Sequence, residues 1–151
     1  MRFNGQWRRC DDGMVRPVIR GEILASDGSR HATEFLVDTG ADRTVISADA
    51  LKRLKLPLRD SDERIGGIGG LAESVTIAAR LRLRRDDDEW VTFRGEYAAC
   101  MNYEILDMSV LGRDILNLFA VIVHRAANVR YPDFGEFQVG PDSTTGTLGM
   151  V

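Results

Sequence analysis

The chain has 151 residues, of which 44% are apolar and 28% are charged, and its net charge is −3 at neutral pH. This size and composition fit one globular domain and exclude a wholly disordered chain, and the longest apolar run, 118–123, is too short to cross a bilayer. The weak negative charge gives no electrostatic reason to bind nucleic acid, so we expect neither a membrane nor a nucleic-acid partner.

The first part of the chain predicts a β-hairpin. Apolar residues over 18–24 and 32–37 predict two strands, and the turn formers Ser26-Asp27-Gly28-Ser29 lie between them. Residues 1–14 are polar and rich in arginine. We therefore expect them to form an N-terminal extension ahead of the folded domain.

A short helix is expected over 47–56. Ser47 is a suitable N-cap, and Asp49 lies in the first turn, where the helix dipole favours an acid. Leu51 and Leu54 lie on one side of the helix, and Pro57 would end it.

A long strand over 75–83 follows, since apolar residues alternate there with threonine, alanine or arginine. This period of two places the apolar side chains on one face and the guanidinium groups in water. Three aspartates over 86–88 predict a turn into a further strand over 90–93. The apolar members of the alternation are Val75, Ile77, Ala79, Leu81 and Leu83.

The last part of the chain predicts a second short helix that begins near Arg113 or Asp114, with Ile115, Leu116 and Phe119 on its buried side. A strand over 120–123 follows, and the turn-forming residues 140–151 predict a disordered tail. The expected domain is therefore 15–139, and its fold class is mainly β with two short helices.

Cysteine and histidine are too sparse to predict a metal site. Cys10 and Cys100 lie far apart in the sequence, as do His31 and His124, so we expect no metal and no cofactor. Cys100 lies in an apolar run that predicts a core thiol, although a disulfide with Cys10 stays open. No apolar stretch follows the N-terminal arginines, so we expect no secretory signal and a reducing, cytoplasmic location.

Three segments carry candidate chemistry, and the first is Asp38-Thr39-Gly40, directly after the strand 32–37. Burying an acid at the end of a strand costs free energy unless the carboxylate is hydrogen-bonded or has a functional role. Gly40 allows a close backbone approach, and the Thr39 hydroxyl can hold the loop. An Asx-type turn is the structural alternative.

The second segment is the glycine-rich run 65–71, in which Gly67-x-Gly69-x-x-Ala72 formally matches a dinucleotide-binding fingerprint. That fingerprint requires an apolar strand before it and a helix after it. Charged residues over 59–64 precede the run and the strand 75–83 follows, so both flanks argue against a nucleotide site. A mobile hairpin tip whose Ile68 touches a ligand and a purely structural glycine loop both remain open.

The third segment is Val110-Leu111-Gly112-Arg113-Asp114, where a glycine precedes the second expected helix. A cation in the first turn opposes the helix dipole, so Arg113 should have a carboxylate partner, and Asp42 is the candidate. A generic surface arginine is the alternative.

Taken in this order, the three segments resemble the active-site loop, the flap and the start of the C-terminal helix in the retroviral-type aspartic proteases (retropepsins). Arg16-Pro17 followed by a strand is similar to the opening of that family, so the resemblance spans 16–124. It implies a retropepsin-like acid-protease half: a closed β-barrel with a flap hairpin and two short helices, in a C2 homodimer.

The resemblance also implies residue roles. Asp38, Thr39 and Gly40 would form the catalytic motif, with Asp38 as the catalytic acid and Thr39 bonded across the dimer axis. Asp42 would pair with Arg113 of its own chain and with Arg16 of the other chain. The residues implied to bind substrate are Leu36, Ala41, Asp42, Arg43, Val45, Ile65, Gly66, Gly67, Ile68, Met108 and Val110.

The chain also departs from the family pattern. The helix over 47–56 is additional to the minimal viral enzyme, and Arg43 replaces a second acid that is usual in some viral members. Its outer specificity pocket should therefore favour different side chains. Residues precede and follow the matching region, so the dimer interface is expected to be built differently.

Aspartic protease chemistry requires two carboxylates that share a proton and a water molecule. The chain has a single Asp-Thr-Gly, so two copies related by a two-fold axis are needed to complete the site. The sequence thus predicts a homodimeric aspartic endopeptidase whose peptide or protein substrate binds as an added strand. A non-catalytic peptide-binding or assembly module of the same fold is the alternative.

Overall fold

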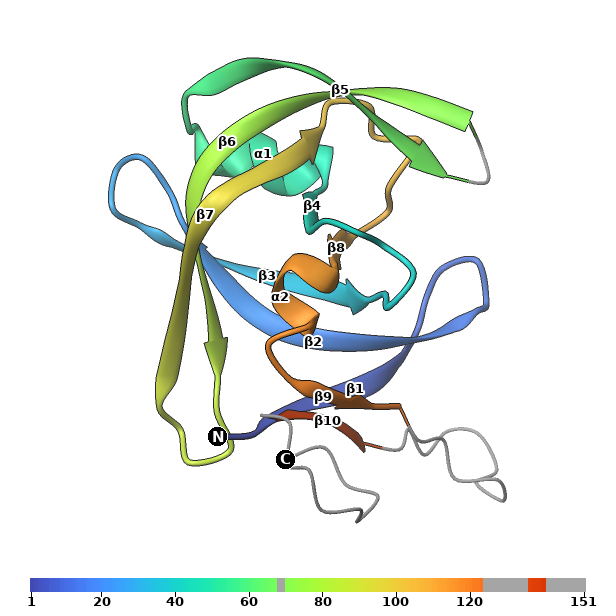
Figure 1. Ribbon diagram of the computed structural model, residues 1–151, viewed down its shortest axis with the longest axis vertical. Helices are drawn as coiled ribbons and strands as arrows, with labels where there is room; N and C mark the ends of the chain where they lie inside the picture. Colours follow the sequence, from blue (N-terminus) through green and yellow to red (C-terminus); the bar gives the residue numbers. More distant parts are fainter. Residues whose placement is uncertain (68–69, 124–135, 141–151) are drawn as a thin grey trace.

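A computed structural model of the chain describes residues 1–67, 70–123 and 136–140, and these ranges contain ten strands and two short helices (Figure 1). The helices are α1 (Ala48–Leu54) and α2 (Arg113–Leu116). The mainly β class with two helices is confirmed. The strands are β1 (Phe3–Arg9), β2 (Val15–Leu24), β3 (Arg30–Val37), β4 (Val45–Ile46), β5 (Leu58–Gly67), β6 (Gly70–Arg84), β7 (Trp90–Cys100), β8 (Ser109–Leu111), β9 (Ala120–Ile122) and β10 (Glu136–Gly140).

Six of the described strands close into a barrel in the order β6-β7-β4-β8-β3-β2, since β6 also pairs with β2. The length of β6 makes this closure possible. Its first part pairs with β5 in a hairpin that projects from the barrel, and Leu81 and Leu83 near its end lie opposite Ile23 and Gly21 of β2. The closed barrel expected from the resemblance is therefore present, and the β5–β6 hairpin crosses the top of Figure 1.

The core fills the barrel with apolar side chains from alternate strand positions. On β6, Ile77, Leu81 and Leu83 are fully buried, as the period of two predicts. Arg82, which was expected in water, is half-buried instead, since its guanidinium lies 4.6 Å from the centre of the Trp90 ring and 3.5 Å from Oε2 of Glu22. An aromatic face and a carboxylate compensate the cation for the water that it loses.

Strand β1 lies in the segment expected to precede the folded domain, and the sequence did not predict it. Phe3 is fully buried, and its ring packs edge-on against Phe119 with the ring centres 5.2 Å apart. β1 pairs with β2 on one side and with β10 on the other. The sequence showed no sign of this strand because the segment is rich in polar residues. The buried Phe3 ring anchors it to the core. The tail expected over 140–151 lies outside the described residues except for Gly140, which ends β10.

Helix α1 is shorter than the range 47–56 that the sequence predicts. Ser47 lies at the N-cap without a side-chain cap, and its hydroxyl instead accepts a hydrogen bond from the Ser109 hydroxyl at 3.3 Å. The helix ends at Leu54, because the C-cap residue Lys55, two positions before Pro57, has a left-handed backbone. In the second helix the position of Phe119 differs from the prediction: its side chain is buried, but it lies beyond the end of α2.

The two cysteines are buried free thiols, so no disulfide joins Cys10 to Cys100. Cys100 is fully buried, which confirms the core thiol. In the described part of the chain, neither helix has the length and apolar character that a membrane span requires.

Gly21 lies where β6 closes the barrel on β2. A Cβ atom on Gly21 would lie 2.6 Å from the Arg82 carbonyl oxygen and 2.8 Å from Cδ2 of Leu83. Gly21→Ala should therefore lower the free energy of unfolding by about 1–3 kcal/mol, measured by urea denaturation. Gly95→Ala is the matched control, because its Cβ would come no closer than 3.5 Å to the Tyr97 ring. Equal losses in the two variants would contradict this account.

Tyr97 gives the fold a testable dependence on alkaline pH. Burial, and secondarily the charge of Asp114, raises the pKa of Tyr97 from 10.0 to about 12. The corresponding stability is complete below pH 10 and is lost as the pH rises through about 12. Tyr97→Phe should therefore lose less stability over this interval, as thermal unfolding would measure. Tyrosinate absorbance of the folded wild-type protein should also show a late phase that the variant lacks. Complete ionisation of all tyrosines near pH 10 would be the contrary result.

Candidate active site

Asp38 lies directly after β3, and the pairing of β3 with β8 sets its position. The two strands run parallel, with Leu36 opposite Val110 and Val37 opposite Leu111. The Asp38 backbone N–H donates to the Leu111 carbonyl at 3.2 Å. Asp38, which is half-buried, therefore lies at the end of a strand inside the barrel sheet, where its backbone is held by β8.

The loop after Asp38 is an Asx-type turn. Oδ1 of Asp38 accepts a hydrogen bond from the Gly40 N–H at 2.8 Å, and the Ala41 N–H donates to the Asp38 carbonyl at 3.3 Å. A Cβ atom on Gly40 would lie 3.1 Å from Oδ1, so a larger residue at this position would crowd the Asp38 carboxylate. The Asx-type turn that the sequence allowed is thus present. It orients the Asp38 carboxylate, which is also the group expected to act in catalysis. Thr39 is exposed beside it.

Thr44 ties this loop to the start of α2. Its side chain is fully buried, and its hydroxyl donates to Oδ1 of Asp114 at 2.7 Å while accepting from the Gly112 N–H at 3.1 Å. The Thr44 N–H also donates to the Asp114 carboxylate at 2.9 Å. Neither Thr44 nor Asp114 was expected in the site from the sequence, because 70 positions separate the two residues and no local pattern links them.

Backbone contacts complete the junction. The Arg113 N–H donates to the Ala41 carbonyl at 2.8 Å, and the Asp114 N–H donates to the Asp42 carbonyl at 3.2 Å. The Arg113 guanidinium forms an ion pair with the Asp42 carboxylate of the same chain. A Cβ atom on Gly112 would lie 2.3 Å from the carbonyl carbon of Arg43, so only glycine fits there.

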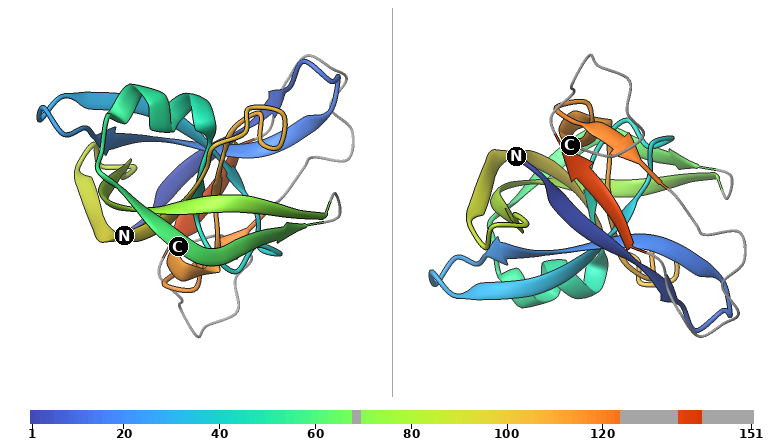
Figure 2. Two further views of the ribbon diagram at one scale, coloured as in Figure 1. Left: turned by 90° about the horizontal axis from the view of Figure 1, so that it is seen from above. Right: turned by 90° about the horizontal axis from the view of Figure 1, so that it is seen from below.

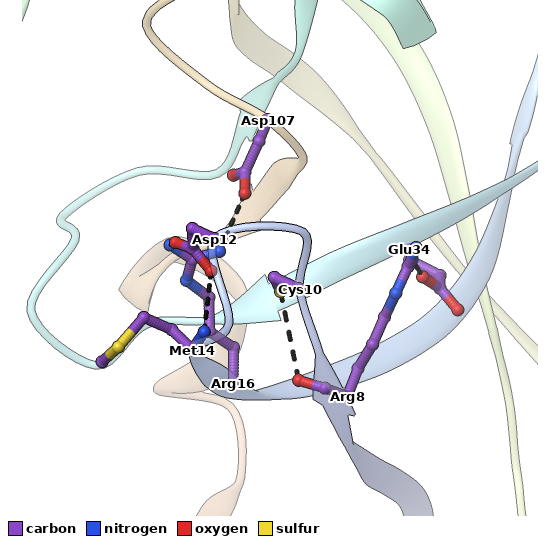
Figure 3. Close-up of polar contacts among 7 residues, drawn as sticks. All are labelled: Arg8, Cys10, Asp12, Met14, Arg16, Glu34 and Asp107. Carbon is purple, nitrogen blue, oxygen red and sulfur yellow. Dashed lines mark hydrogen bonds and ion pairs between the residues drawn. The ribbon is translucent and has the colours of Figure 1, made fainter.

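Arg16 is engaged within its own chain. Its Nη1 lies 2.8 Å from Oδ2 of Asp107, and its Nη2 contacts the Asp12 carboxylate (Figure 3). The contact of Arg16 with Asp42 of another copy, which the resemblance implies, stays a prediction.

A cavity of about 270 Å³ lies between the active-site loop and the β5–β6 hairpin. It brings together six of the residues proposed to bind substrate and Gly40 of the catalytic motif, and it adds Arg64, Ser74 and Ala98. These three residues lie on β5, β6 and β7. The sequence did not predict them, because it does not give the register in which these strands pair. The full lining is Gly40, Ala41, Asp42, Arg43, Val45, Arg64, Ile65, Gly66, Ser74 and Ala98.

An apolar cluster adjoins this cavity. Val45, Cys100 and Val110 form its buried centre, and Leu36 and Ile65 are among the residues packed against it. Leu36 and Val110, proposed as substrate-binding residues, thus lie in the packing that supports the cleft.

The other proposed residues are placed as follows. Met108 is half-buried immediately before β8, and Gly67 ends β5. Ile68 lies outside the described residues. The described part of the chain contains no group of three or more His, Cys, Asp or Glu side chains placed to hold a metal ion.

Comparison with known proteins gives one family and one fold. The model of the aspartyl protease family matches residues 21–115. A retropepsin-like aspartic protease from Rickettsia conorii superposes with a TM-score of 0.53 at 16% identity, covering 92% of this chain and 91% of that chain. EIAV protease in complex with the inhibitor HBY-793 superposes with a TM-score of 0.50 at 24% identity, covering 68% and 86%. No curated protein sequence matches the chain. At these identities the solved structures establish a retropepsin-like fold.

The Thr44 hydroxyl gives a testable prediction for this junction. Thr44→Val would remove both of its hydrogen bonds and leave the buried Gly112 N–H without its acceptor. The free energy of unfolding should fall by about 1–3 kcal/mol in urea denaturation. Thr44→Ser keeps the hydroxyl and should retain most of the stability. A valine variant as stable as the wild-type protein would show that the junction does not depend on this hydroxyl.

Proposed function

The chain belongs to the aspartyl protease family, whose model spans residues 21–115, and we propose that it is an endopeptidase whose active unit is a homodimer with one Asp38 from each subunit. The placement of Asp38 carries this proposal. Its carboxyl group lies at the end of β3, held by the Gly40 N–H, in a loop that borders a cavity beneath the β5–β6 hairpin. The family resemblance inferred from the three motifs is confirmed.

The dimer follows from the chemistry. Hydrolysis by this route needs one protonated carboxyl group to polarise the peptide carbonyl and one carboxylate to take a proton from the attacking water. The chain contains a single Asp-Thr-Gly, so it contributes one of the two groups. A residue near a two-fold axis meets its own image, and two copies of Asp38 would complete the pair.

The substrate is proposed to be an extended peptide between the active-site loop and the β5–β6 hairpin. The two elements face each other across the cavity of about 270 Å³, which offers room for a substrate side chain. Ile65 and Val45 give this space an apolar wall. Backbone groups of both elements would then pair with the peptide as with an added strand.

Three further assignments belong to the same proposal. The exposed Thr39 would bond to its counterpart across the axis, and Arg16 would exchange a local partner for Asp42 of the other subunit. The protein is proposed to act in the cytoplasm, where Cys10 and Cys100 would stay reduced.

Asp38→Asn tests the catalytic role directly. The amide oxygen can still accept the hydrogen bond from the Gly40 N–H, so the fold and the dimer should be retained. Cleavage of a fluorogenic peptide library should fall by about 10³-fold or more, because the variant lacks the general base. Circular dichroism and sedimentation would verify the fold and the assembly.

Asp27→Asn is the matched control, because Oδ1 of Asp27 also accepts from a backbone N–H two residues later, that of Ser29, at 2.8 Å. This exposed turn lies outside the proposed site, and the variant should keep full activity. Undiminished cleavage by Asp38→Asn would refute the proposal. Peptide binding without cleavage by the wild-type protein would favour the non-catalytic module.

A further inference from the structure

Two arginines, here called the arginine pair, lie side by side on β6 and β7. Arg80 is directly opposite Arg94 in the register of the two strands, and both residues are exposed. Like charges at directly opposed positions repel each other and lower the stability of a sheet. The arginine pair therefore opposes folding, which points to a role other than stability.

Neighbouring arginines on β6 have acidic partners, whereas this pair has none. A guanidinium nitrogen of Arg82 lies 3.5 Å from Oε2 of Glu22, and one of Arg84 lies 2.9 Å from Oδ1 of Asp88. Within the described ranges of the chain, Arg80 and Arg94 form neither an ion pair nor a side-chain hydrogen bond. Their guanidinium groups are thus available to an acidic group of another molecule.

The arginine pair borders a hollow of about 380 Å³. Ala79 and Gly95, which also lie opposite each other in register, leave space there because their side chains are so small. Leu24 at the end of β2 and Leu56 after α1 add apolar walls. The hollow therefore combines apolar surface with two cations that have no partner among the described residues. Its full lining is Leu24, Ala25, Leu56, Ala78, Ala79, Arg80, Arg94 and Gly95.

A second hollow, of about 350 Å³, lies between the arginine pair and the active-site cavity. It shares Arg43 and Ala98 with that cavity. It also includes Thr76 and Glu96, which lie on β6 and β7 between the cavity and the pair. The surface is therefore hollowed along these two strands from the active-site cavity to the arginines.

The strand geometry places the three sites in line. β6 contributes Ser74 to the active-site cavity, Thr76 to the second hollow and Arg80 to the arginine pair. Because side chains two positions apart point to the same face of a strand, these three share one face. Arg80 lies about 20 Å from Ser74 along β6, at about 3.3 Å per residue. In Figures 1 and 2 the β2–β3 turn, which follows Leu24, lies on the side of the molecule opposite the free end of the β5–β6 hairpin.

We infer that an acidic segment of a polypeptide substrate binds along this face with a carboxylate between Arg80 and Arg94, an inference that rests on the proposed function. A guanidinium donates two parallel hydrogen bonds to a carboxylate, so two of them can hold one aspartate or glutamate side chain from both sides. A neighbouring apolar side chain of the segment enters the hollow beside Leu24 and Leu56. A peptide that fills the cleft and continues in extended form reaches the arginine pair about six residues further on.

Peptide binding to Asp38→Asn tests this inference without cleavage. The probes are fluorescein-labelled peptides of about twelve residues, long enough at about 3.3 Å per residue to span the cleft and the arginine pair. One peptide alternates glutamate with leucine, and the other alternates glutamine with leucine. Fluorescence anisotropy should show that the glutamate peptide binds about tenfold more tightly, because only its side chains carry the charge that the arginines recognise.

Arg80→Gln and Arg94→Gln, each added to Asp38→Asn, should raise the dissociation constant of the glutamate peptide by about tenfold. Neither change should lower the melting temperature, because each removes a repulsion between like charges. In the protein with Asp38 intact, the same changes should raise the KM for long acidic peptides and leave kcat unchanged. Cleavage of peptides of about six residues, too short to reach the pair, should not change.

Arg20→Gln is the matched control. The Arg20 side chain is 72% exposed on β2 and lies 3.0 Å from Oε1 of Glu34, and it does not line the hollow. This variant removes one positive charge from the barrel surface and should bind the glutamate peptide like its parent. A loss equal to that of Arg80→Gln would show that overall charge, not the arginine pair, attracts the peptide, and would contradict the inference.

The remaining outcomes separate this inference from the proposed function. Equal binding of the two peptides, or binding unaffected by both arginine variants, would overturn the inference even if the protein cleaves peptides. Displacement of the peptide by an equal concentration of free glutamate would also overturn it, by assigning the pair to a small anion. Binding as expected to a protein that cleaves nothing in its wild-type form would support the surface and refute the proposed function.

Discussion

The hydrogen bonds between Thr44 and Asp114 hold together the two segments from which the site is built. Thr44 is fully buried, and both its hydroxyl and its backbone N–H donate to the carboxylate of Asp114. A buried hydroxyl without partners would be costly, so these bonds favour one arrangement of the loop over others. The position of Asp38, six residues earlier in the same loop, depends on this junction and on the close approach that Gly112 permits.

The barrel and the cleft depend on the same strand. β6 closes the barrel by pairing with β2, and its first part forms the hairpin with β5 that covers the cavity. One continuous strand therefore contributes both to the closed barrel and to the hairpin above the cavity. The sequence contains a single Asp-Thr-Gly, so the activity proposed for the chain requires a second copy.

The arginines position loops more than they stabilise the fold. The side chains of Arg113 and Asp42 are 49% and 78% exposed, and exposed ion pairs of this kind contribute about 1 kcal/mol or less. Their importance lies in geometry, because Arg113 connects the active-site loop to α2 and Arg16 connects two loops beside it. Arg82 differs, since burial against an aromatic ring makes it part of the packing.

The sequence by itself determined the features that local patterns encode. The period of two along β6, the turn formers between strands and the motif at Asp38 predicted the fold class and the candidate acid, because each depends on residues a few positions apart. Only the tertiary structure decided which distant groups meet: Asp114 at Thr44, Arg16 at Asp107, and Ser74 in the wall of the cavity. These contacts depend on strand order and register, which bring together side chains that no local pattern relates.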